Sequence, residues 1–122
     1  MNKRILIVDD SSFARSMLTE IFIKHGYDVV GEASSGSEAL EKYGQLKPDL
    51  VTMDIAMPGL DGIMAIKEII HSFPEARVVV ISSIHSKEIV KKALLAGAFD
   101  YVIKPFTKER LLKAIDKALL QG

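Results

Sequence analysis

Five short apolar runs, rich in β-branched residues, recur along this 122-residue chain and constrain its fold more than any other feature. They are Ile5 to Val8, Val29 to Val30 with its flanks, Leu50 to Met53, Val78 to Ile81 and Tyr101 to Ile103. Such continuous runs are typical of parallel strands that are buried on both faces. The segments between them carry apolar residues at helical spacing, for example Ile63, Ile66, Ile69 and Ile70, and Leu111, Leu112, Ile115, Leu119 and Leu120. Five alternations of strand and helix predict one α/β domain over residues 1–122, a doubly wound (βα)5 parallel sheet with helices on both faces.

Residues that begin and end helices fall between the predicted elements. The Asp-Ser-Ser run at 10–12 and Thr107 are predicted N-caps, and Gly26 and Gly97 stand where helices should end. All four prolines, at positions 48, 58, 74 and 105, also lie between elements. These local signals agree with the alternation.

The charge and cysteine content exclude several classes of protein. Sixteen basic and 16 acidic side chains give zero formal net charge, so the chain has no overall attraction to nucleic acid or to an anionic membrane. The chain has no cysteine, which excludes disulfide scaffolds, thiolate zinc sites and cysteine nucleophiles. The apolar run near the N-terminus is too short for a signal peptide, and no run approaches the ~18 residues of a membrane span. We therefore expect a cytoplasmic protein without a direct nucleic-acid or membrane partner.

Polar side chains follow four of the five predicted strands. Asp9-Asp10 ends the first, Asp54 the third, Ser82-Ser83 the fourth and Lys104-Pro105 the fifth. Because ligands of open parallel sheets bind beyond the carboxyl ends of the strands, these residues are expected at one shared edge. Three carboxylates in one cleft repel each other unless a cation intervenes, and Lys104 offsets only one charge. Their oxygen atoms suit Mg2+, and the sequence has no His or Cys cluster for zinc.

Each of these residues also has a purely structural interpretation. An aspartate pair before a helix is more often a cap than a ligand, and single polar residues at strand ends often close turns. Together, however, their complementary chemistry at four strand ends favours a functional site. His25, His71 and His85 share no spacing, and we expect them at the surface.

Other kinds of phosphate site fit the sequence poorly. Gly31 to Ser37 has the glycine spacing of a P-loop but places Ser37 at the position of the phosphate-binding lysine. A flavodoxin-type FMN site would place its phosphate loop after the first strand, where this chain has two carboxylates. The Gly-x-Gly-x-x-Gly pattern of dinucleotide folds is absent from the same place.

Several segments together resemble the receiver domain of two-component response regulators. They are Ile5-Leu-Ile-Val-Asp-Asp10, Pro48-Asp-Leu-Val-Thr-Met-Asp54-Ile-Ala-Met-Pro58-Gly-Leu-Asp-Gly62, Ser82-Ser83, Gly97-Ala98 and Lys104-Pro105-Phe106. The resemblance runs from end to end. Within the family, the Ser12-Phe13-Ala14-Arg15 segment and the end at Gly122 are similar to the single-domain chemotaxis regulators. The resemblance alone implies a flavodoxin-like sheet with strand order 2-1-3-4-5.

The resemblance also implies a reaction and a metal site. Asp54 would be the phosphoacceptor, attacking phosphohistidine on a sensor histidine kinase, with Lys104 helping to neutralise charge. Asp10, Asp54 and the backbone carbonyl of Ala56 would hold Mg2+ directly, and Asp9 would act mainly through water.

A switch is implied by the same resemblance. The hydroxyl of Ser82 would bind a phosphoryl oxygen, and Tyr101 would then move inward. The peptide bond before Pro105 is expected to be cis. Two positions depart from the family, because Ala56 and Ile84 stand where polar side chains are common. We therefore expect slow hydrolysis of the phosphoryl group, since no side chain there orients the attacking water.

The output of this switch is expected to be a protein–protein contact on the fourth helix, fifth strand and fifth helix. Residues 62–122 carry ten basic and six acidic side chains, whereas residues 1–61 carry six basic and ten acidic ones. Six lysines lie in the fourth and fifth predicted helices: Lys87, Lys91, Lys92, Lys108, Lys113 and Lys117. The expected partner is a flagellar motor or adaptor protein, and a phosphatase is a further candidate.

The predicted function is therefore a chemotaxis response regulator, a signalling protein whose only chemistry is its own phosphorylation and slow autodephosphorylation. Another interpretation is the receiver part of a larger effector, such as a DNA-binding response regulator or the chemotaxis methylesterase. A small metal-dependent phosphatase with an Asp nucleophile is a third. That class would need an Asp-x-Asp pair after the first strand and a cap domain, and the sequence has neither.

Overall fold

The computed structural model describes residues 2–58 and 62–120, and its strands and helices alternate as the sequence predicts. The strands are β1 (Arg4–Val8), β2 (Asp28–Ala33), β3 (Leu50–Met53), β4 (Val78–Ser82) and β5 (Asp100–Ile103). The helices are α1 (Ser12–Lys24), α2 (Gly36–Leu46), α3 (Gly62–Ser72), α4 (Lys87–Ala96) and α5 (Lys108–Leu120). Within these residues, no helix is both long enough and apolar enough to cross a bilayer.

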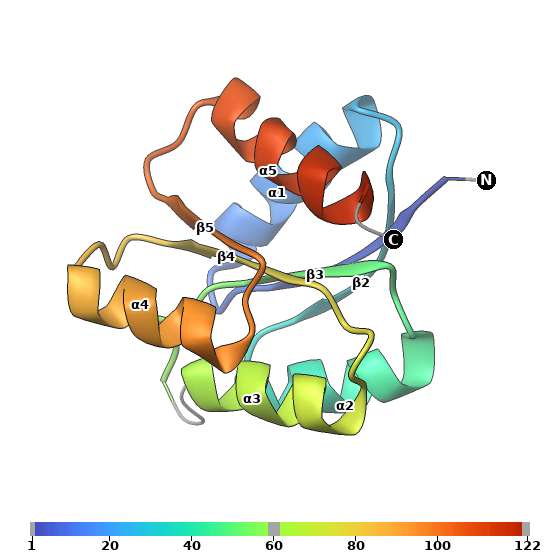
Figure 1. Cartoon of the computed structure of the whole chain (residues 1–122). Coiled ribbons are helices and arrows are strands. Elements are labelled where there is room, and N and C mark those ends of the chain that lie inside the picture. The colour runs from blue at the N-terminus through green and yellow to red at the C-terminus, as the bar shows by residue number, and fades with distance from the viewer. Residues whose placement is uncertain (1, 59–61, 121–122) are drawn as a thin grey trace.

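The strands form one parallel sheet in the order β2-β1-β3-β4-β5, which confirms the predicted fold class and strand order. Helices α1 and α5 cover one face of the sheet, and α2, α3 and α4 cover the other (Figure 1). The strand order reverses at β1, which lies between β2 and β3. In open α/β sheets, the crevice beyond the carboxyl ends of the strands at such a reversal is the usual ligand site.

The side chains of β1 alternate between two hydrophobic cores, one on each face of the sheet. Ile5 and Ile7 join the core under α1 and α5, whereas Leu6 and Val8 join the core under α2, α3 and α4. All four are at most 1% exposed, and burying each contributes about 1.5–3 kcal/mol relative to exposure. The two cores fix β1, and with it the position of the residues that follow.

Strand β2 corrects the prediction that every strand is buried on both faces. It forms one edge of the sheet, and Ala33 is its only buried residue. Its register against β1 also shifts between Ile5 and Leu6. The prediction is wrong for this strand, and for Ile103 of β5, which is 44% exposed, because β2 and β5 are the two edge strands and their side chains are less enclosed.

The predicted helix ends are confirmed by their hydrogen bonds. The hydroxyl of Ser11 accepts from the N–H of Ala14 at 3.2 Å, and the hydroxyl of Thr107 accepts from the N–H of Arg110 at 3.1 Å. Such caps contribute about 1 kcal/mol each. Gly97 ends α4 with φ of 121°, and a Cβ there would lie 2.3 Å from Cδ1 of Ile70. The positive φ favours glycine at this position, and a larger residue would also have to displace the Ile70 side chain.

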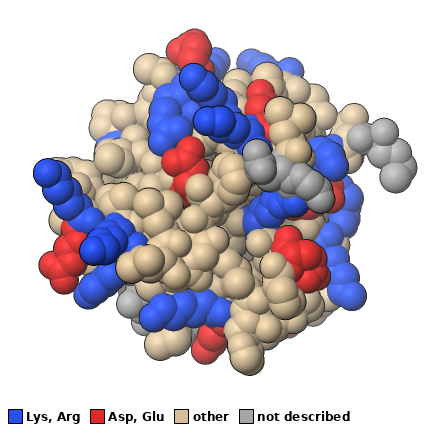
Figure 2. Space-filling model, in the orientation of Figure 1, with Lys and Arg blue, Asp and Glu red and all other residues tan. Residues whose placement is uncertain are grey.

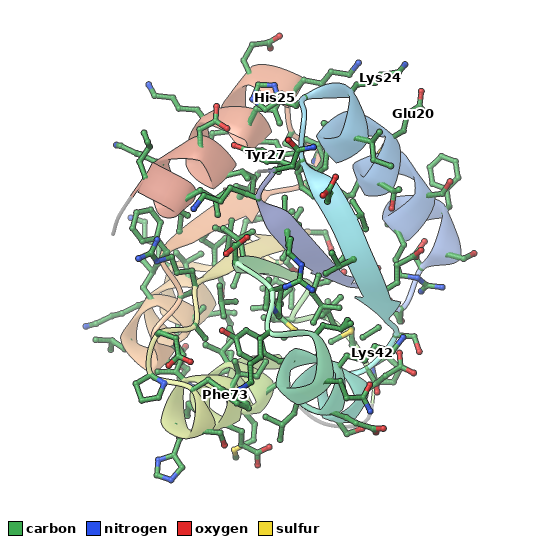
Figure 3. The ribbon with its side chains drawn as sticks, turned by 90° about the vertical axis from the view of Figure 1, so that its right-hand side faces the viewer. Glu20, Lys24, His25, Tyr27, Lys42 and Phe73 are labelled. Atoms are coloured by element: carbon green, nitrogen blue, oxygen red, sulfur yellow. The ribbon has the colours of Figure 1, made fainter. Side chains whose placement is uncertain are left out.

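Polar side chains at the C-terminal end of α1, among them His25 and Tyr27, contact α5 (Figure 3). His25 lies at the surface as predicted, and its Nε2 is 3.2 Å from both carboxylate oxygens of Asp116 on α5. The hydroxyl of Tyr27 donates to the same carboxylate. Burial and the neighbouring Asp116 carboxylate together raise the pKa of Tyr27, so this hydroxyl keeps its proton. The cluster joins the two helices that cover one face of the sheet.

Candidate functional site

The carboxyl ends of the parallel strands lie at the same end of the sheet, and main-chain hydrogen bonds continue past them. The N–H of Asp9 donates to the carbonyl of Ala33, and the N–H of Asp54 donates to the carbonyl of Val8, both at 3.0 Å. On the other side, the N–H of Lys104 donates to the carbonyl of Ser82 at 2.9 Å. This end of the sheet, which we call the acidic edge, thus gathers the residues predicted for the site: Asp9, Asp10, Asp54, Ser82 and Lys104.

Lys104 bridges two buried carboxylates at this edge. Asp9 is 2% exposed, with Oδ1 accepting from the N–H of Ser11 at 2.9 Å and Oδ2 from Nζ of Lys104 at 2.8 Å. Asp54 is 8% exposed, with Oδ1 accepting from the N–H of Ala56 at 2.9 Å and Oδ2 lying 3.3 Å from the same Nζ. The ammonium group therefore neutralises part of the charge that folding collects here.

The environment of Lys104 keeps its side chain protonated. Burial lowers the pKa of its ammonium group, but the hydrogen bond to Asp9 and the charge of Asp54 outweigh burial and raise the pKa above its usual value. The peptide bond between Lys104 and Pro105 is cis, as the resemblance implied. The lysine is thus a fixed positive charge beside the two carboxylates.

Asp10 completes a group of three carboxylates. Asp9, Asp10 and Asp54 each offer one oxygen, and these oxygens lie within 4.8 Å of one another. Asp10 is exposed, whereas the other two are buried. Carboxylate oxygens gathered at this spacing, with solvent access on one side, fit a hard divalent cation such as Mg2+, which binds through a few carboxylates and keeps several waters.

Tyr101 and Ser82 lie side by side against the segment that follows β4. Ser82 is completely buried, and its hydroxyl accepts from the N–H of Ile84 at 3.2 Å. The ring of Tyr101 is also buried, and its hydroxyl donates to the carbonyl of Ile84 at 2.5 Å. Burial raises the pKa of Tyr101, with the Ser82 hydroxyl partly opposing and the Asp54 charge adding to this rise. The Tyr101 ring therefore occupies a buried, inward position in this structure.

The family model for the response regulator receiver domain matches residues 5–116 of this chain. The chain belongs to this family. A chemotaxis protein CheY of Thermotoga maritima is 51% identical over 117 residues, which cover 96% of this chain and 98% of that protein. A chemotaxis protein CheY of Bacillus subtilis is 49% identical over 119 residues, which cover 98% of this chain and 99% of that protein. In a crystal structure of the CheX–CheY–BeF3–Mg complex from Borrelia burgdorferi, the matching chain has a TM-score of 0.91 at 36% identity, covering 94% of this chain and 87% of that one.

The two departures from the usual receiver pattern both lie next to the acidic edge. Ala56 is exposed and donates its N–H to Asp54, so this position supplies only main-chain groups. Ile84 is partly buried against the core under α2, α3 and α4. Its N–H and carbonyl are used by Ser82 and Tyr101. Neither side chain can orient a water molecule for attack on this edge of the receiver domain.

Arg15 also contributes to the receiver site, a role that was not predicted from the sequence. Its Nη1 donates to the carbonyl of Asp9 at 2.7 Å, and its Nε donates to Glu32 at 2.9 Å. It therefore fixes the main chain of the buried aspartate from α1. A cation in the first turn of a helix opposes the helix dipole, and this unfavourable placement is the signal that could have identified it.

The loop after β3 is described in part. Gly59 to Asp61, which belong to the motif that carried the resemblance, lie outside the described residues. Gly62 begins α3 so close to the segment after β3 that a Cβ there would lie 2.5 Å from Cα of Ile55. Only glycine allows this approach, which brings α3 of the receiver domain against the segment directly after Asp54.

Proposed function

We propose that this receiver domain is a chemotaxis response regulator in which Asp54 accepts a phosphoryl group from a sensor histidine kinase. The observation that carries the proposal is the environment of Asp54, whose carboxylate is nearly buried, contacts Lys104 and lies beside two further carboxylates. The relatives named chemotaxis protein CheY match over almost their whole length. This extent of similarity supports chemotaxis over a DNA-binding or methylesterase effector.

In the proposed reaction, a carboxylate oxygen of Asp54 attacks the phosphorus atom of phosphohistidine. The O–P bond forms as the P–N bond breaks, the electron pair returns to the imidazole nitrogen, and Asp54 becomes an acyl phosphate. Such transfers depend mainly on alignment and on neutralisation of charge. The N–H of Ala56 orients Oδ1, and Lys104 lies where its ammonium group can stabilise the transferred group.

Mg2+ is the proposed cofactor, and when bound it supplies positive charge between the carboxylates and the phosphoryl oxygens. We assign Asp10, Asp54 and the backbone carbonyl of Ala56 as its direct ligands. Asp10 has no hydrogen-bond or ion-pair partner among the described residues, so its oxygens remain available. Asp9 is more deeply buried than Asp54, at 2% against 8% exposed, and has the shorter contact to Lys104, at 2.8 against 3.3 Å, which supports action mainly through water.

Ser82 and Tyr101 are the proposed switch. The hydroxyl of Ser82 binds a phosphoryl oxygen in this proposal, and that shift alters its contact with the N–H of Ile84. Tyr101 contacts the carbonyl of the same residue, so the two side chains share one segment of main chain. A change at Ser82 thereby alters the preferred position of the Tyr101 ring, and a partner that binds one position better shifts the equilibrium.

The proposed output surface is the face formed by α4, β5 and α5. A groove of about 460 Å3 lies there between α4 and β5, lined by His85, Lys87, Val90, Lys91, Leu94, Leu95 and Ile103. Figure 2 shows this face with largely uncharged surface at its centre and Lys and Arg side chains around it, with some Asp and Glu side chains among them. An acidic, amphipathic helix of a flagellar motor or adaptor protein fits this combination, and its affinity is expected to fall as salt rises.

Mass spectrometry after treatment with Mg2+ and a small phosphodonor tests the proposed function. The unchanged protein is expected to gain one phosphoryl group, Asp54→Ala none, and Asp28→Ala, an exposed aspartate at the start of β2, one. An Asp54→Ala protein that gains the group as readily as the unchanged protein would overturn the assignment.

Titration with Mg2+ tests the assigned ligands. Asp10→Asn is expected to weaken Mg2+ binding more than Asp9→Asn, because only Asp10 is proposed to contact the ion directly. The reverse order would show that the two roles are exchanged.

Amide chemical shifts with and without beryllofluoride test the output surface. We expect changes at the acidic edge and across residues 86–113. Changes confined to the acidic edge would refute this surface.

A further inference from the structure

Strand β5 forms the second edge of the sheet, which leaves alternate main-chain groups without a partner strand. The N–H of Lys104 donates to the carbonyl of Ser82 on β4. The main-chain N–H and carbonyl of Val102, two residues earlier, therefore also face β4. The main-chain N–H and carbonyl of Tyr101 face away from β4, toward the open edge of the sheet. Such groups usually bind water or another chain.

Both main-chain groups of Tyr101 are instead held by one ion pair. Its N–H donates to Oδ1 of Asp100 at 2.7 Å, and its carbonyl accepts from Nη2 of Arg110 at 2.9 Å. Arg110 lies on α5, and its two terminal nitrogens also donate to the two oxygens of Asp100 at 3.1 and 3.3 Å. We call these two side chains the Asp100–Arg110 clamp. A guanidinium group is suited to this arrangement because its donors point in fixed directions.

The clamp and the phenol of Tyr101 act on opposite ends of the same residue. At one end the hydroxyl contacts Ile84, and at the other the main chain is fixed between Asp100 and Arg110. Burial raises the pKa of Asp100, but the hydrogen bonds from Arg110 and from the N–H of Tyr101 outweigh it and lower the pKa below its ordinary value. The carboxylate therefore stays charged and paired at neutral pH.

We propose that Asp100 and Arg110 are positioning residues of the switch, because they fix the main chain of Tyr101 so that its ring stays in the inward position. The clamp also couples that position to α5, one of the elements of the output surface. This inference rests on the proposed function, in which Tyr101 responds to the state of Asp54. An ordinary surface ion pair would stabilise the fold slightly and leave the ring unaffected.

Fluorine NMR of protein labelled with 3-fluorotyrosine tests the proposal. The chain has three tyrosines, and Tyr101→Phe identifies the relevant signal. In Arg110→Gln and Asp100→Asn, we expect the ratio of inward to outward ring to fall about fivefold, the low end of typical coupling between linked sites. The low end applies because the two side chains are 45% and 31% exposed. Arg110→Lys should give an intermediate ratio, since one ammonium group cannot match the donor geometry of guanidinium.

A matched control is available on α1. Lys24 and Glu20 form an ion pair at 2.9 Å that is 71% and 67% exposed and holds no main-chain group (Figure 3). Lys24→Gln should leave the Tyr101 signal unchanged. An unchanged signal in both Arg110→Gln and Asp100→Asn, or an equal shift in Lys24→Gln, would overturn the proposal.

Mass spectrometry separates this inference from the proposed function. Neither Asp100 nor Arg110 contacts Asp54 in the described hydrogen bonds and ion pairs, so both variants should gain a phosphoryl group like the unchanged protein. If the unchanged protein gains none, the proposed function fails, whatever the fluorine signal does. If all proteins gain the group but the Tyr101 signal is the same in each, only the clamp proposal fails. Should Arg110→Gln not fold, Asp100→Asn and Arg110→Lys give the same test.

Discussion

Thr52 provides a sharp test of the energetics of this fold, because its hydroxyl is buried without a partner. The side chain is 1% exposed, and its Oγ1 has no hydrogen bond among the described residues. It lies in β3 between Ile7 of β1 and Val79 of β4, on the face of the sheet that α1 and α5 cover. Burying a hydroxyl without a hydrogen bond costs roughly 1–3 kcal/mol.

Replacing Thr52 with Val keeps the shape and removes the polar atom. We expect Thr52→Val to raise the free energy of unfolding by about 1–2 kcal/mol, because β3 is central and the methyl group gains apolar contacts. For a domain of this size, each 1 kcal/mol moves the thermal midpoint by roughly 3–6 °C. Urea unfolding, followed by circular dichroism at constant pH, measures the change.

Thr19→Val is the matched control for this measurement. The hydroxyl of Thr19 donates to the carbonyl of Arg15 at 2.7 Å on the half-buried side of α1. Its loss should leave stability unchanged or lower it by less than about 1 kcal/mol. A Thr52→Val protein that is no more stable than the unchanged one would refute the reasoning, because the hydroxyl would then be satisfied in solution.

Three other perturbations have expected outcomes that follow from the acidic edge and the clamp. Lys104→Ala should lower the free energy of unfolding by about 3 kcal/mol in urea, because Asp9 then keeps a buried charge without its ammonium partner; a loss below 1 kcal/mol would contradict the buried pair. Ala56→Asn combined with Ile84→Glu should speed loss of the phosphoryl group, followed by mass spectrometry over time, because polar side chains then orient water; an equal or slower rate counts against this explanation. The pKa of the Asp100 carboxyl is lowered in the folded protein, so its stabilising effect is present above the ordinary aspartate pKa of about 3.9 and is lost as pH falls through the folded value. The stability difference between the unchanged protein and Asp100→Asn should therefore close in acid, and a difference that stays constant down to full protonation would contradict the assignment.

The strand ends show how far the sequence alone could lead. Parallel strands share one carboxyl edge, so the convergence of Asp54 and Lys104 followed from where the apolar runs stop. The sequence could not show that Asp9 is enclosed while Asp10 is exposed, because that difference depends on how neighbouring segments cover two adjacent residues. The burial of β2 was predicted wrongly for a related reason, since apolar content does not reveal which strand lies at an edge.

The role of Arg110 was beyond prediction from the sequence. Nothing in its neighbourhood along α5 indicates that its side chain reaches back to the main chain of Tyr101. That contact depends on where α5 packs against β5 in three dimensions. Long side chains at the surface can reach several partners, and sequence patterns do not distinguish among them.

The position of Lys104 between Asp9 and Asp54 has a consequence for how the protein is made in the cell. Proteins whose acidic clusters are neutralised only by a metal ion couple folding to the supply of that ion. Here Lys104 supplies one positive charge between the two buried carboxylates, and the third carboxylate is exposed to water, so folding should depend less on a cation. Under the proposed function, changes in free magnesium are therefore expected to alter how many molecules can accept a phosphoryl group more than how many are folded.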